Sequence, residues 1–460
     1  MPYHARKDIV REGEVGTYHC WSRCVQKAFL CGYDHHLQLD FSYRRGWIED
    51  LLAYQARLFA VDVGNYSVLS NHLHAILRTR PDIAATWCDE ELALRWKMAW
   101  PSFVDGRWVS EPSEAGVNKL LASPTKIDQI RRNLSSLSWF MARWKEPIAK
   151  LCNAEVDHRG HFWEARFGSR ELLDEEAVLT CSIYVDLNQV RAGLADSLEA
   201  SEYSSIRRRI RAAKRREAVA SQEDFSRRDP SGKYAFSHGD AETLFEDCWL
   251  APITAEQPVS TVAWLGAERD VTTETEAGGS PTLGSNGAER EPQEAAERDA
   301  PADPEKPDDE AGSTEGKSGR LADNDPTHDP DSQFSNTKRR WHAMLARRRA
   351  SDTPMLTVKW SEYLRATMSV AALVDPNSST DLGRQDDPTL AHNVADILQR
   401  WGLNPIPWLH GLLQLDSQCT RVLGTAGNVL HRAREASQQC FHGIRLCRQM
   451  FSHNEGTTFT

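Results

Sequence analysis

The segment from residue 72 to residue 79 constrains the fold most, because it reads as a strand with one apolar face and one histidine-bearing face. Successive side chains of a strand point to opposite faces. His72 and His74 therefore share a face, while Leu73 between them points to the other side. The pattern predicts a sheet with one face packed on a core and two imidazoles close enough to bind one ion. Two half-buried histidines with no ligand are the alternative.

A predicted helix at residues 174–193 carries the second informative pattern. Asp174 is a suitable N-cap, and Gly193 is a suitable residue at the C-terminal end. Tyr184 and Asn188 are four residues apart, so a helix places them on the same face, one turn from each other. The alternative is that Tyr184 is an ordinary core residue on this helix.

The order of the predicted elements indicates an α+β fold. Strands are expected at residues 17–23, 58–63, 72–79 and 162–167, and helices at residues 43–57 and 126–144. This β-α-β-β-α-β order is that of a ferredoxin-like antiparallel sheet covered on one face, with the tyrosine helix following it against the histidine strand. Residues 81–123 are longer than a connection requires, so we expect an insertion there.

The two motifs resemble those of the single-tyrosine HUH transposases, most closely the REP-associated tyrosine transposase branch. The His-hydrophobic-His motif is matched by His72-Leu73-His74, and the tyrosine motif by residues 184–193, where Gln189 replaces the usual proline. Further family-like stretches occur in the same order at residues 18–23, 162–167 and 203–205. The resemblance covers about residues 14 to 206.

The resemblance implies a metal-dependent single-stranded DNA endonuclease and strand transferase. Tyr184 would be the catalytic nucleophile, and His72, His74 and Asn188 would hold Mg²⁺ or Mn²⁺. Attack by the tyrosine would leave a 5′-phosphotyrosine and a free 3′-hydroxyl, and the reverse step would rejoin strands without ATP. Since an unperturbed tyrosine has a pKa of about 10, the hydroxyl needs the metal to polarise the scissile phosphate.

The implied partner is single-stranded DNA, presented beside a hairpin. Seven basic side chains fall within residues 207–216, a run that either neutralises phosphates or forms a solvated helix face. Other arginines lie in or beside the expected strands. The candidate DNA contacts are Arg23, Arg166, Arg170, Arg207, Arg208 and Arg209.

An acidic stretch divides the chain. Residues 266–332 hold 19 Asp and Glu, six Lys and Arg and no aromatic residue. The net charge of this stretch is therefore −13, which is more negative than the net charge of the whole chain, −11. Such a composition predicts a disordered linker. We expect an HUH nuclease domain at 1–206, a basic extension at 207–258, the linker at 259–337 and a small helical domain at 338–460. The helical domain could bind DNA, pair subunits or contact another protein.

The ten cysteines show no zinc-binding spacing, and no apolar run approaches the roughly eighteen residues of a membrane span. We therefore expect free thiols, a bacterial cytoplasmic location and no membrane partner. A monomer and a homodimer are both open. Two other functions are also open: a catalytically silent hairpin-DNA-binding protein derived from such a transposase, and a different HUH enzyme such as a replication initiator or relaxase.

Overall fold

The computed structural model falls into two units, of which the first contains nearly all of the residues that can be described. The first unit comprises Met1–Ala263 and Lys338–Thr460, and the second comprises Trp264–Thr337. The expected linker at 259–337 lies outside the described residues except for its last position. The structure describes residues 9–25, 28–34, 38–228, 246–255, 337, 340–341, 343–345, 348–374, 395–415, 421–441 and 443–452.

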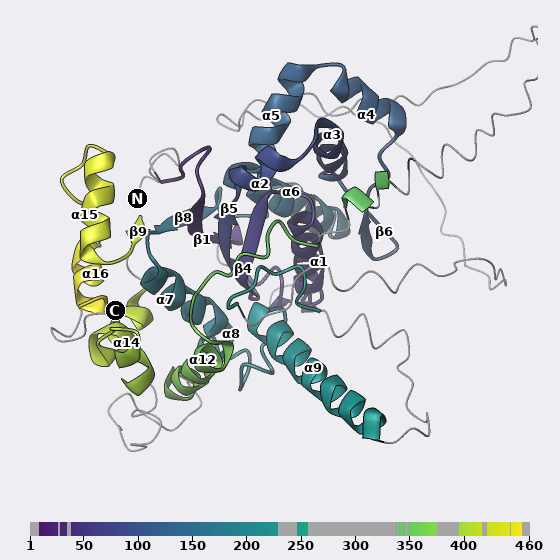
Figure 1. Cartoon of the computed structure of the whole chain (residues 1–460). Coiled ribbons are helices and arrows are strands. Elements are labelled where there is room, and N and C mark those ends of the chain that lie inside the picture. The colour runs from purple at the N-terminus through teal and green to yellow at the C-terminus, as the bar shows by residue number, and fades with distance from the viewer. Residues whose placement is uncertain are drawn as a thin grey trace, which may run out of the picture. The chain divides into compact units, whose positions relative to one another are not determined.

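A five-stranded sheet of order β4-β5-β1-β8-β9 forms the centre of the first unit (Figure 1). The first four strands in this order are antiparallel to their neighbours, and β9 is parallel to β8. The fold is thus mixed α/β and compatible with the expected α+β class. The strands are β1 Gly16–Arg23, β4 Val61–Val68, β5 His72–Thr79, β8 Gly168–Leu172 and β9 Val422–Leu423.

The register of the sheet sorts its side chains onto two different faces. Trp21 pairs with His74, and Arg23 pairs with His72. Directly paired residues of an antiparallel sheet point to the same face. His19, two residues before Trp21, therefore shares the face of the histidine pair. The opposite face is apolar and carries Tyr18, Cys20, Leu73, Ala75 and Leu77, all of them buried.

Helices cover both faces of the sheet. The apolar face packs on α1 (Arg44–Ala56) and α6 (Leu137–Glu155), which contribute to one hydrophobic core. The histidine face is covered by α7 (Glu175–Asp186), which forms a second core with Ile76 of β5. This confirms that the tyrosine helix lies against the histidine strand. The helix expected at 126–144 is in fact two helices, α5 (Pro124–Leu134) and α6, because the chain breaks at Ser135 and Ser136.

The strand expected at residues 162–167 is wrong, since β8 begins only at Gly168. Residues 162–167 make a single bridge, between Trp163 and Cys24, and then turn outward so that Arg166 is exposed. A Cβ atom at Gly168 would lie 2.3 Å from the ring of Trp21. The last strand therefore starts where glycine allows the backbone to pass under the tryptophan.

Residues 81–123 form a compact insertion that joins the core on the α1 and α6 side. Trp96 and Trp108 are buried in that core. The insertion thus enlarges the core and is not an extended loop. Its elements are α2 Pro81–Thr86, α3 Asp89–Met98, the hairpin β6 Ser102–Val104 with β7 Arg107–Val109, and α4 Glu114–Leu121.

The C-terminal residues are helical, as expected, and they pack on the tyrosine helix. Figure 1 shows the last helices on the β9 side of the sheet, next to α7. Trp408 donates from Nε1 to Thr180 Oγ1 of α7 at 2.8 Å. These residues and α7 share one hydrophobic core. The helices are α12 Trp360–Val374, α14 Pro405–Gln414, α15 Ala426–Glu435 and α16 Ile444–Met450. None of the described helices is long and apolar enough to cross a membrane.

Candidate active site

The tyrosine helix begins and ends as the sequence predicts. The Asp174 side chain accepts a hydrogen bond from the Ala177 amide at 3.0 Å, and Gly193 has a φ of +65°, which ends the helical stretch. The stretch is interrupted once: α7 ends at Asp186, and a short helix, α8 (Asn188–Arg191), follows Leu187. Tyr184 therefore lies in the last turn of α7, and Asn188 is the first residue of α8.

Tyr184 contacts His74 on the histidine face of the sheet, and His72 lies beside His74. The ring centroids of Tyr184 and His74 are 5.7 Å apart in an edge-on arrangement, and those of His72 and His74 are 5.1 Å apart. Tyr184 comes from α7 and the histidines from β5, more than a hundred residues earlier in the chain. The fold thus brings together three of the four residues expected to carry the chemistry.

The Nδ1 atom of each histidine has a partner within hydrogen-bond distance. His72 Nδ1 lies 2.6 Å from Asn71 Oδ1, and His74 Nδ1 lies 2.9 Å from Nε2 of His19. Among the described residues the two Nε2 atoms make no hydrogen bond. The amide oxygen of Asn71 can only accept, so His72 carries its proton on Nδ1 and has a lone pair on Nε2. A histidine held in this way is suited to bind a metal ion.

Asn188 offers a third donor. Its side chain is 5% exposed, and its Nδ2 is buried with no hydrogen-bond partner among the described residues. A buried N–H donor left without a partner costs about 1–3 kcal/mol, so an acceptor such as a water or phosphate oxygen beside Nδ2 would be stabilising. The described residues contain no group of three or more His, Cys, Asp or Glu that could hold a metal ion. The resemblance to HUH transposases implies that the Asn188 amide oxygen would be the third ligand for a cation at the histidine pair.

This donor set fits a divalent cation. Two neutral imidazoles and one amide leave coordination positions for water and for phosphate oxygens. Burial lowers the pKa of His72 to about 4, with a smaller effect from the nearby charge of Arg23. Burial, and then the neighbouring His19 and His72, lowers the pKa of His74 well below its usual value. Both imidazoles are thus neutral at physiological pH, which metal binding requires.

Two further residues of the site were missed by the sequence prediction. Arg191 places its guanidinium carbon 5.0 Å from the centroid of the Tyr184 ring, and its spacing of seven residues from Tyr184, two helical turns, could have revealed it. His19 lies with its ring centroid 5.7 Å from that of Tyr184. Its alternation with Trp21 and Arg23 on β1 was the signal for a shared face.

The nucleophile candidate is closed off from solvent. Tyr184 is 1% exposed, whereas Arg191, which stacks on its ring, is only half-buried. A phosphate can therefore reach the tyrosine hydroxyl only if a neighbouring group moves. Arg191 is more exposed than His19 and His74, whose rings also contact Tyr184.

The structure separates the expected DNA-binding arginines into exposed and buried ones. Arg23 and Arg166 are exposed near the histidine end of the sheet. Arg170 is buried, and its Nη2 donates to the carbonyl of Leu415 at 3.1 Å. Arg209 is also buried, and its Nη2 donates to the carbonyls of Gly64 and Ala251 at 2.7 Å. We therefore correct the prediction for Arg170 and Arg209, because neither guanidinium faces a surface that DNA could reach.

The basic run at residues 207–216 is occupied within the protein. It lies on α9 (Ser205–Arg228), where Arg208 pairs with Glu49 at 2.5 Å and Arg207 pairs with Glu202 at 3.3 Å. The remaining basic side chains of the run, Arg211, Lys214, Arg215 and Arg216, pair with Glu246, Glu199, Glu246 and Asp247. Within this run Arg208 and Arg209 are held by buried partners, whereas Arg211, Lys214 and Arg215 form exposed ion pairs, which contribute little to stability.

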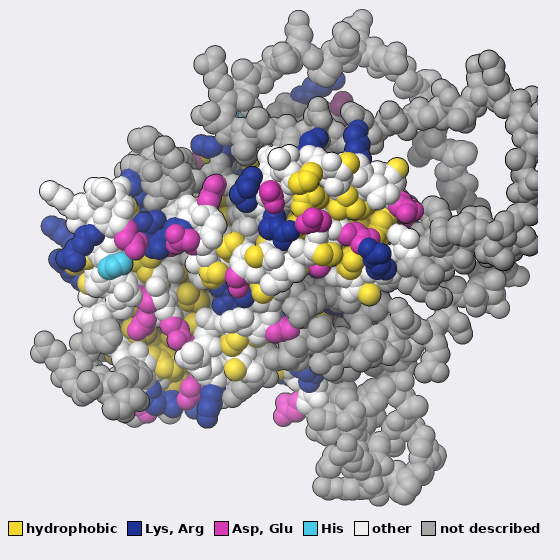
Figure 2. All heavy atoms as spheres, turned by 45° about the horizontal axis from the view of Figure 1, so that its top comes forward, with side chains coloured by type: hydrophobic (Ala, Val, Ile, Leu, Met, Phe, Trp, Pro, Cys, Tyr) yellow, Lys and Arg dark blue, Asp and Glu magenta, His cyan; other side chains and the backbone are white. Residues whose placement is uncertain are grey.

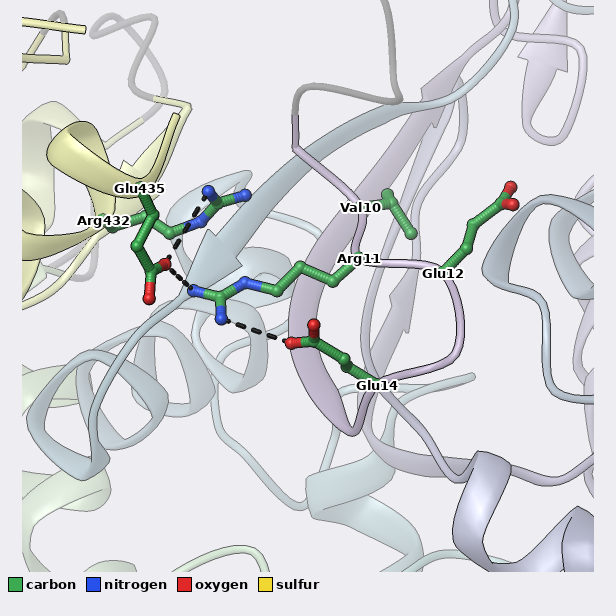
Figure 3. Close-up of a pocket in the computed structure, with 6 residues that line it drawn as sticks. All are labelled: Val10, Arg11, Glu12, Glu14, Arg432 and Glu435. Carbon is green, nitrogen blue, oxygen red and sulfur yellow. Dashed lines mark hydrogen bonds and ion pairs between the residues drawn. The ribbon is translucent and has the colours of Figure 1, made fainter. Parts of the chain in front are cut away.

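An open cavity of about 460 Å³ lies beside Arg11 (Figure 3). Arg11 pairs with Glu14 at 3.3 Å and with Glu435 at 3.0 Å. Arg11 precedes the first residue of β1, whereas His72 pairs with the last residue of that strand. The cavity is therefore at the opposite end of β1 from the histidine pair. Val10, Glu12 and Arg432 complete its lining.

The charge of the visible surface does not identify a partner. On the face drawn in Figure 2, basic and acidic side chains are interspersed over the described residues.

Comparisons with protein-family models, with curated proteins and with solved structures found no match to this chain.

Proposed function

We propose that this protein is a metal-dependent single-stranded DNA endonuclease and strand transferase that acts through a 5′-phosphotyrosine at Tyr184. The observation that carries the proposal is the packing of the Tyr184 ring against His74, whose neighbour His72 shares the same face. The sequence resemblance to HUH transposases names the same three residues. Under this proposal, hairpin or repeat sequences are the preferred DNA.

The proposed fold agrees with this assignment. Counted along the chain, β1, β4, β5 and β8 are the first, second, third and fourth of these strands. Across the sheet their order is second, third, first, fourth, with α1 after the first strand and α6 before the fourth. A ferredoxin-like sheet has this order and these two helices on one face. We therefore propose that residues 14–206 form a ferredoxin-like HUH domain, to which the insertion and the C-terminal helices have been added.

The residues of the site would share the work of one transesterification. The Tyr184 oxygen would attack the scissile phosphorus, the bond from phosphorus to the 3′ oxygen would break, and that oxygen would leave as a hydroxyl after taking a proton from water. The tyrosine proton would leave to water, and the guanidinium of Arg191 would stabilise the phenolate. The phosphodiester energy is kept in the tyrosine ester, so a new 3′-hydroxyl can reverse the reaction.

His72, His74 and Asn188 would hold the divalent cation. When bound, the cation would polarise the scissile phosphate and offset the charge that develops on it. The donor set has no carboxylate, so we expect DNA phosphate oxygens to tighten the binding. Imidazole ligands favour Mn²⁺ over Mg²⁺, and we expect Mn²⁺ to bind more tightly.

The DNA would approach at the histidine end of the sheet. Arg23 pairs with His72, and the amide of Glu164 donates to the Arg23 carbonyl at 2.9 Å, which brings the loop of Arg166 to the same end. The amide of Cys31 donates to the Ser70 carbonyl at 2.9 Å, just before the histidine motif. That segment carries Phe29, and Tyr33 after it begins the short strand β2 (Tyr33–Asp34); the two residues are 49% and 44% exposed. Exposed aromatic rings and arginines suit unpaired bases and phosphates.

One observation favours a second function. Tyr184 is 1% exposed, and a protein that binds hairpin DNA without cleaving it would have no need to expose this residue. The alternative is therefore a catalytically silent DNA-binding protein derived from such a transposase. The two functions differ in whether DNA becomes bonded to the protein.

A cleavage assay with matched variants tests the proposal. The substrate is a single-stranded hairpin oligonucleotide taken from the DNA that flanks the protein's own coding sequence, with Mn²⁺ or with a chelator. We expect wild-type protein to cleave it with Mn²⁺ only, and Tyr184→Phe and His74→Ala to bind it without cleavage. Tyr203→Phe, which changes a tyrosine outside the site, should cleave normally. Cleavage by Tyr184→Phe would refute the assignment, and binding without cleavage by the wild type would favour the silent protein.

A further inference from the structure

We propose that His19 is a positioning residue, which accepts a hydrogen bond from His74 Nδ1 and thereby fixes the ring nitrogen that His74 presents to a metal ion. The inference rests on the proposed metal site and adds a residue to it. His19 lies on β1, outside the His-hydrophobic-His motif and outside the tyrosine helix.

The geometry of the two rings carries the inference. His19 Nε2 and His74 Nδ1 are 2.9 Å apart, which is an ordinary hydrogen-bond distance. The ring centroids are 5.1 Å apart with an interplanar angle of 17°. Both side chains are buried, so water does not compete for this contact. The contact joins two strands whose register is fixed by a full ladder of pairs.

Only one of the two arrangements of protons allows His74 to bind a metal ion through Nε2. If His19 Nε2 donates, His74 must carry its own proton on Nε2, and the lone pair needed by a metal is lost. If His74 Nδ1 donates, its Nε2 is unprotonated, and His19 must carry its proton on Nδ1. The metal site therefore requires His19 to be the acceptor.

The surroundings of His19 permit this arrangement. Its Nδ1 is buried and has no hydrogen-bond partner within the described part of the chain. No other group therefore holds the His19 proton on one particular nitrogen. His19 can accept from His74 without breaking another bond, and its Nδ1–H is then a buried donor without a partner among the described residues. His72 needs no such help, because Asn71 Oδ1 already accepts from its Nδ1 at 2.6 Å. Each histidine of the motif thus has its own acceptor, one from the preceding residue and one from the neighbouring strand.

Partners of this kind change metal affinity. Removing the group that holds a ligating histidine typically weakens metal binding by 10- to 100-fold. A residue that only fills space would not have this effect, provided that its replacement keeps the volume. The inference therefore predicts a difference between replacements that keep an acceptor and replacements that do not.

The test is the affinity of the full chain for Mn²⁺ without DNA, measured by electron paramagnetic resonance of the free ion. His19→Leu fills the space without an acceptor, His19→Gln keeps an amide oxygen, and Ile76→Val alters the residue that pairs with His19 across the strands. We expect the Kd for Mn²⁺ to rise about 10- to 100-fold in His19→Leu, and by less than about threefold in the other two. Circular dichroism checks that each variant is folded.

The outcomes separate this inference from the proposed function. If wild type binds Mn²⁺ and His72→Ala does not, while His19→Leu binds as wild type does, the role of His19 is refuted and the metal site stands. Equal losses in His19→Leu and His19→Gln would also refute it. If wild type itself binds no Mn²⁺ at millimolar concentration, the metal site fails and the inference fails with it. If His19→Leu does not fold, His19→Asn replaces it, since its shorter amide is not expected to reach His74.

Discussion

At the scale of single residues, three imidazoles share one buried face. Burial lowers the pKa of His19, with a smaller effect from Arg170, as it does for His72 and His74. The sequence predicted the pair on β5, because strand alternation is a local rule. It did not predict His19, because its partner on β5 is 55 residues away and only the pairing register brings them together.

These depressed pKa values predict how stability depends on pH. The three histidines titrate near 6.5 in the unfolded chain and lower in the fold, His72 at about 4. Between these values the unfolded chain holds more protons, so stability falls as pH falls. Each such proton contributes about 1.4 kcal/mol per pH unit. Urea unfolding with a chelator should show a loss of stability from pH 6.5 to 4.5, and His72→Gln should reduce its slope. An unchanged slope would contradict the burial of His72.

Gln189 shows why the family pattern could not be transferred without change. Its Nε2 donates to the carbonyl of Val68 at 3.1 Å and also to the carbonyl of Glu202. These bonds tie α8 to the end of β4 and to the segment before α9. A proline at this position could make neither bond. The glutamine that replaces proline next to Asn188 thus has a structural role, because its side chain makes two hydrogen bonds to the backbone.

At the scale of elements, the sequence correctly predicted those strands and helix ends that depend on neighbouring residues. The strand at 72–79 and the Asp174 cap depend on alternation and on capping chemistry, which neighbouring residues determine. The last strand was misplaced, because the close contact between Gly168 and Trp21 involves two distant strands. The break at Ser135 and Ser136 was missed, because the apolar pattern continues across it.

The loop at residues 28–34 gives a prediction at this scale. In a Tyr184→Phe background, which should not cleave, Phe29→Ala and Tyr33→Ala should each weaken binding of a fluorescein-labelled dT20 oligonucleotide. The expected loss is about 1–3 kcal/mol, because each ring would lose a stacked base. Fluorescence anisotropy measures the affinity. Val104→Ala and Val109→Ala, at residues 49% and 40% exposed on the β6–β7 hairpin, serve as controls and should have no effect. Equal losses in controls and loop variants would rule out the stacking surface.

Exposed arginines at the same end of the sheet should act through charge. Arg23→Ala and Arg166→Ala should each reduce the dependence of log affinity on log salt by about 0.7, the value for one phosphate of single-stranded DNA. Phe29→Ala should leave this slope unchanged. The measurement is anisotropy over a salt series with the same dT20. An unchanged slope in both arginine variants would exclude them as phosphate contacts.

At the scale of the whole molecule, the C-terminal helices are part of the body that holds Tyr184. Tyr363 of α12 donates to Asp186 Oδ2 at 2.5 Å, and Asn65 donates to the same oxygen at 3.0 Å. Burial raises the pKa of Asp186, and its hydrogen bonds offset this only in part. The sequence predicted the C-terminal helices but not that they pack on α7, because no local pattern indicates which surface an apolar helix covers.

Because of this packing, we expect a substitution in the C-terminal helices to lower the free energy of unfolding of the whole body that holds Tyr184. Tyr363→Phe should lower the free energy of unfolding by about 1–3 kcal/mol, since buried Asp186 loses a donor. Tyr43→Phe, whose hydroxyl contacts Glu155 at the exposed surface, is the matched control and should cost less. Urea unfolding followed by tryptophan fluorescence should show one transition that shifts. Two separate transitions, with only one shifted, would contradict a shared core.

The most direct test of the central claim is which end of the DNA becomes bonded to the protein. Wild-type protein is incubated with a single-stranded hairpin labelled at either the 3′ or the 5′ end, with Mn²⁺, and run on a denaturing gel. A 5′-phosphotyrosine at Tyr184 predicts a protein-bound, protease-sensitive label with the 3′-labelled DNA only, and no adduct in Tyr184→Phe or with a chelator. Adduct formation with the 5′-labelled DNA, or an adduct that persists in Tyr184→Phe, would contradict the account.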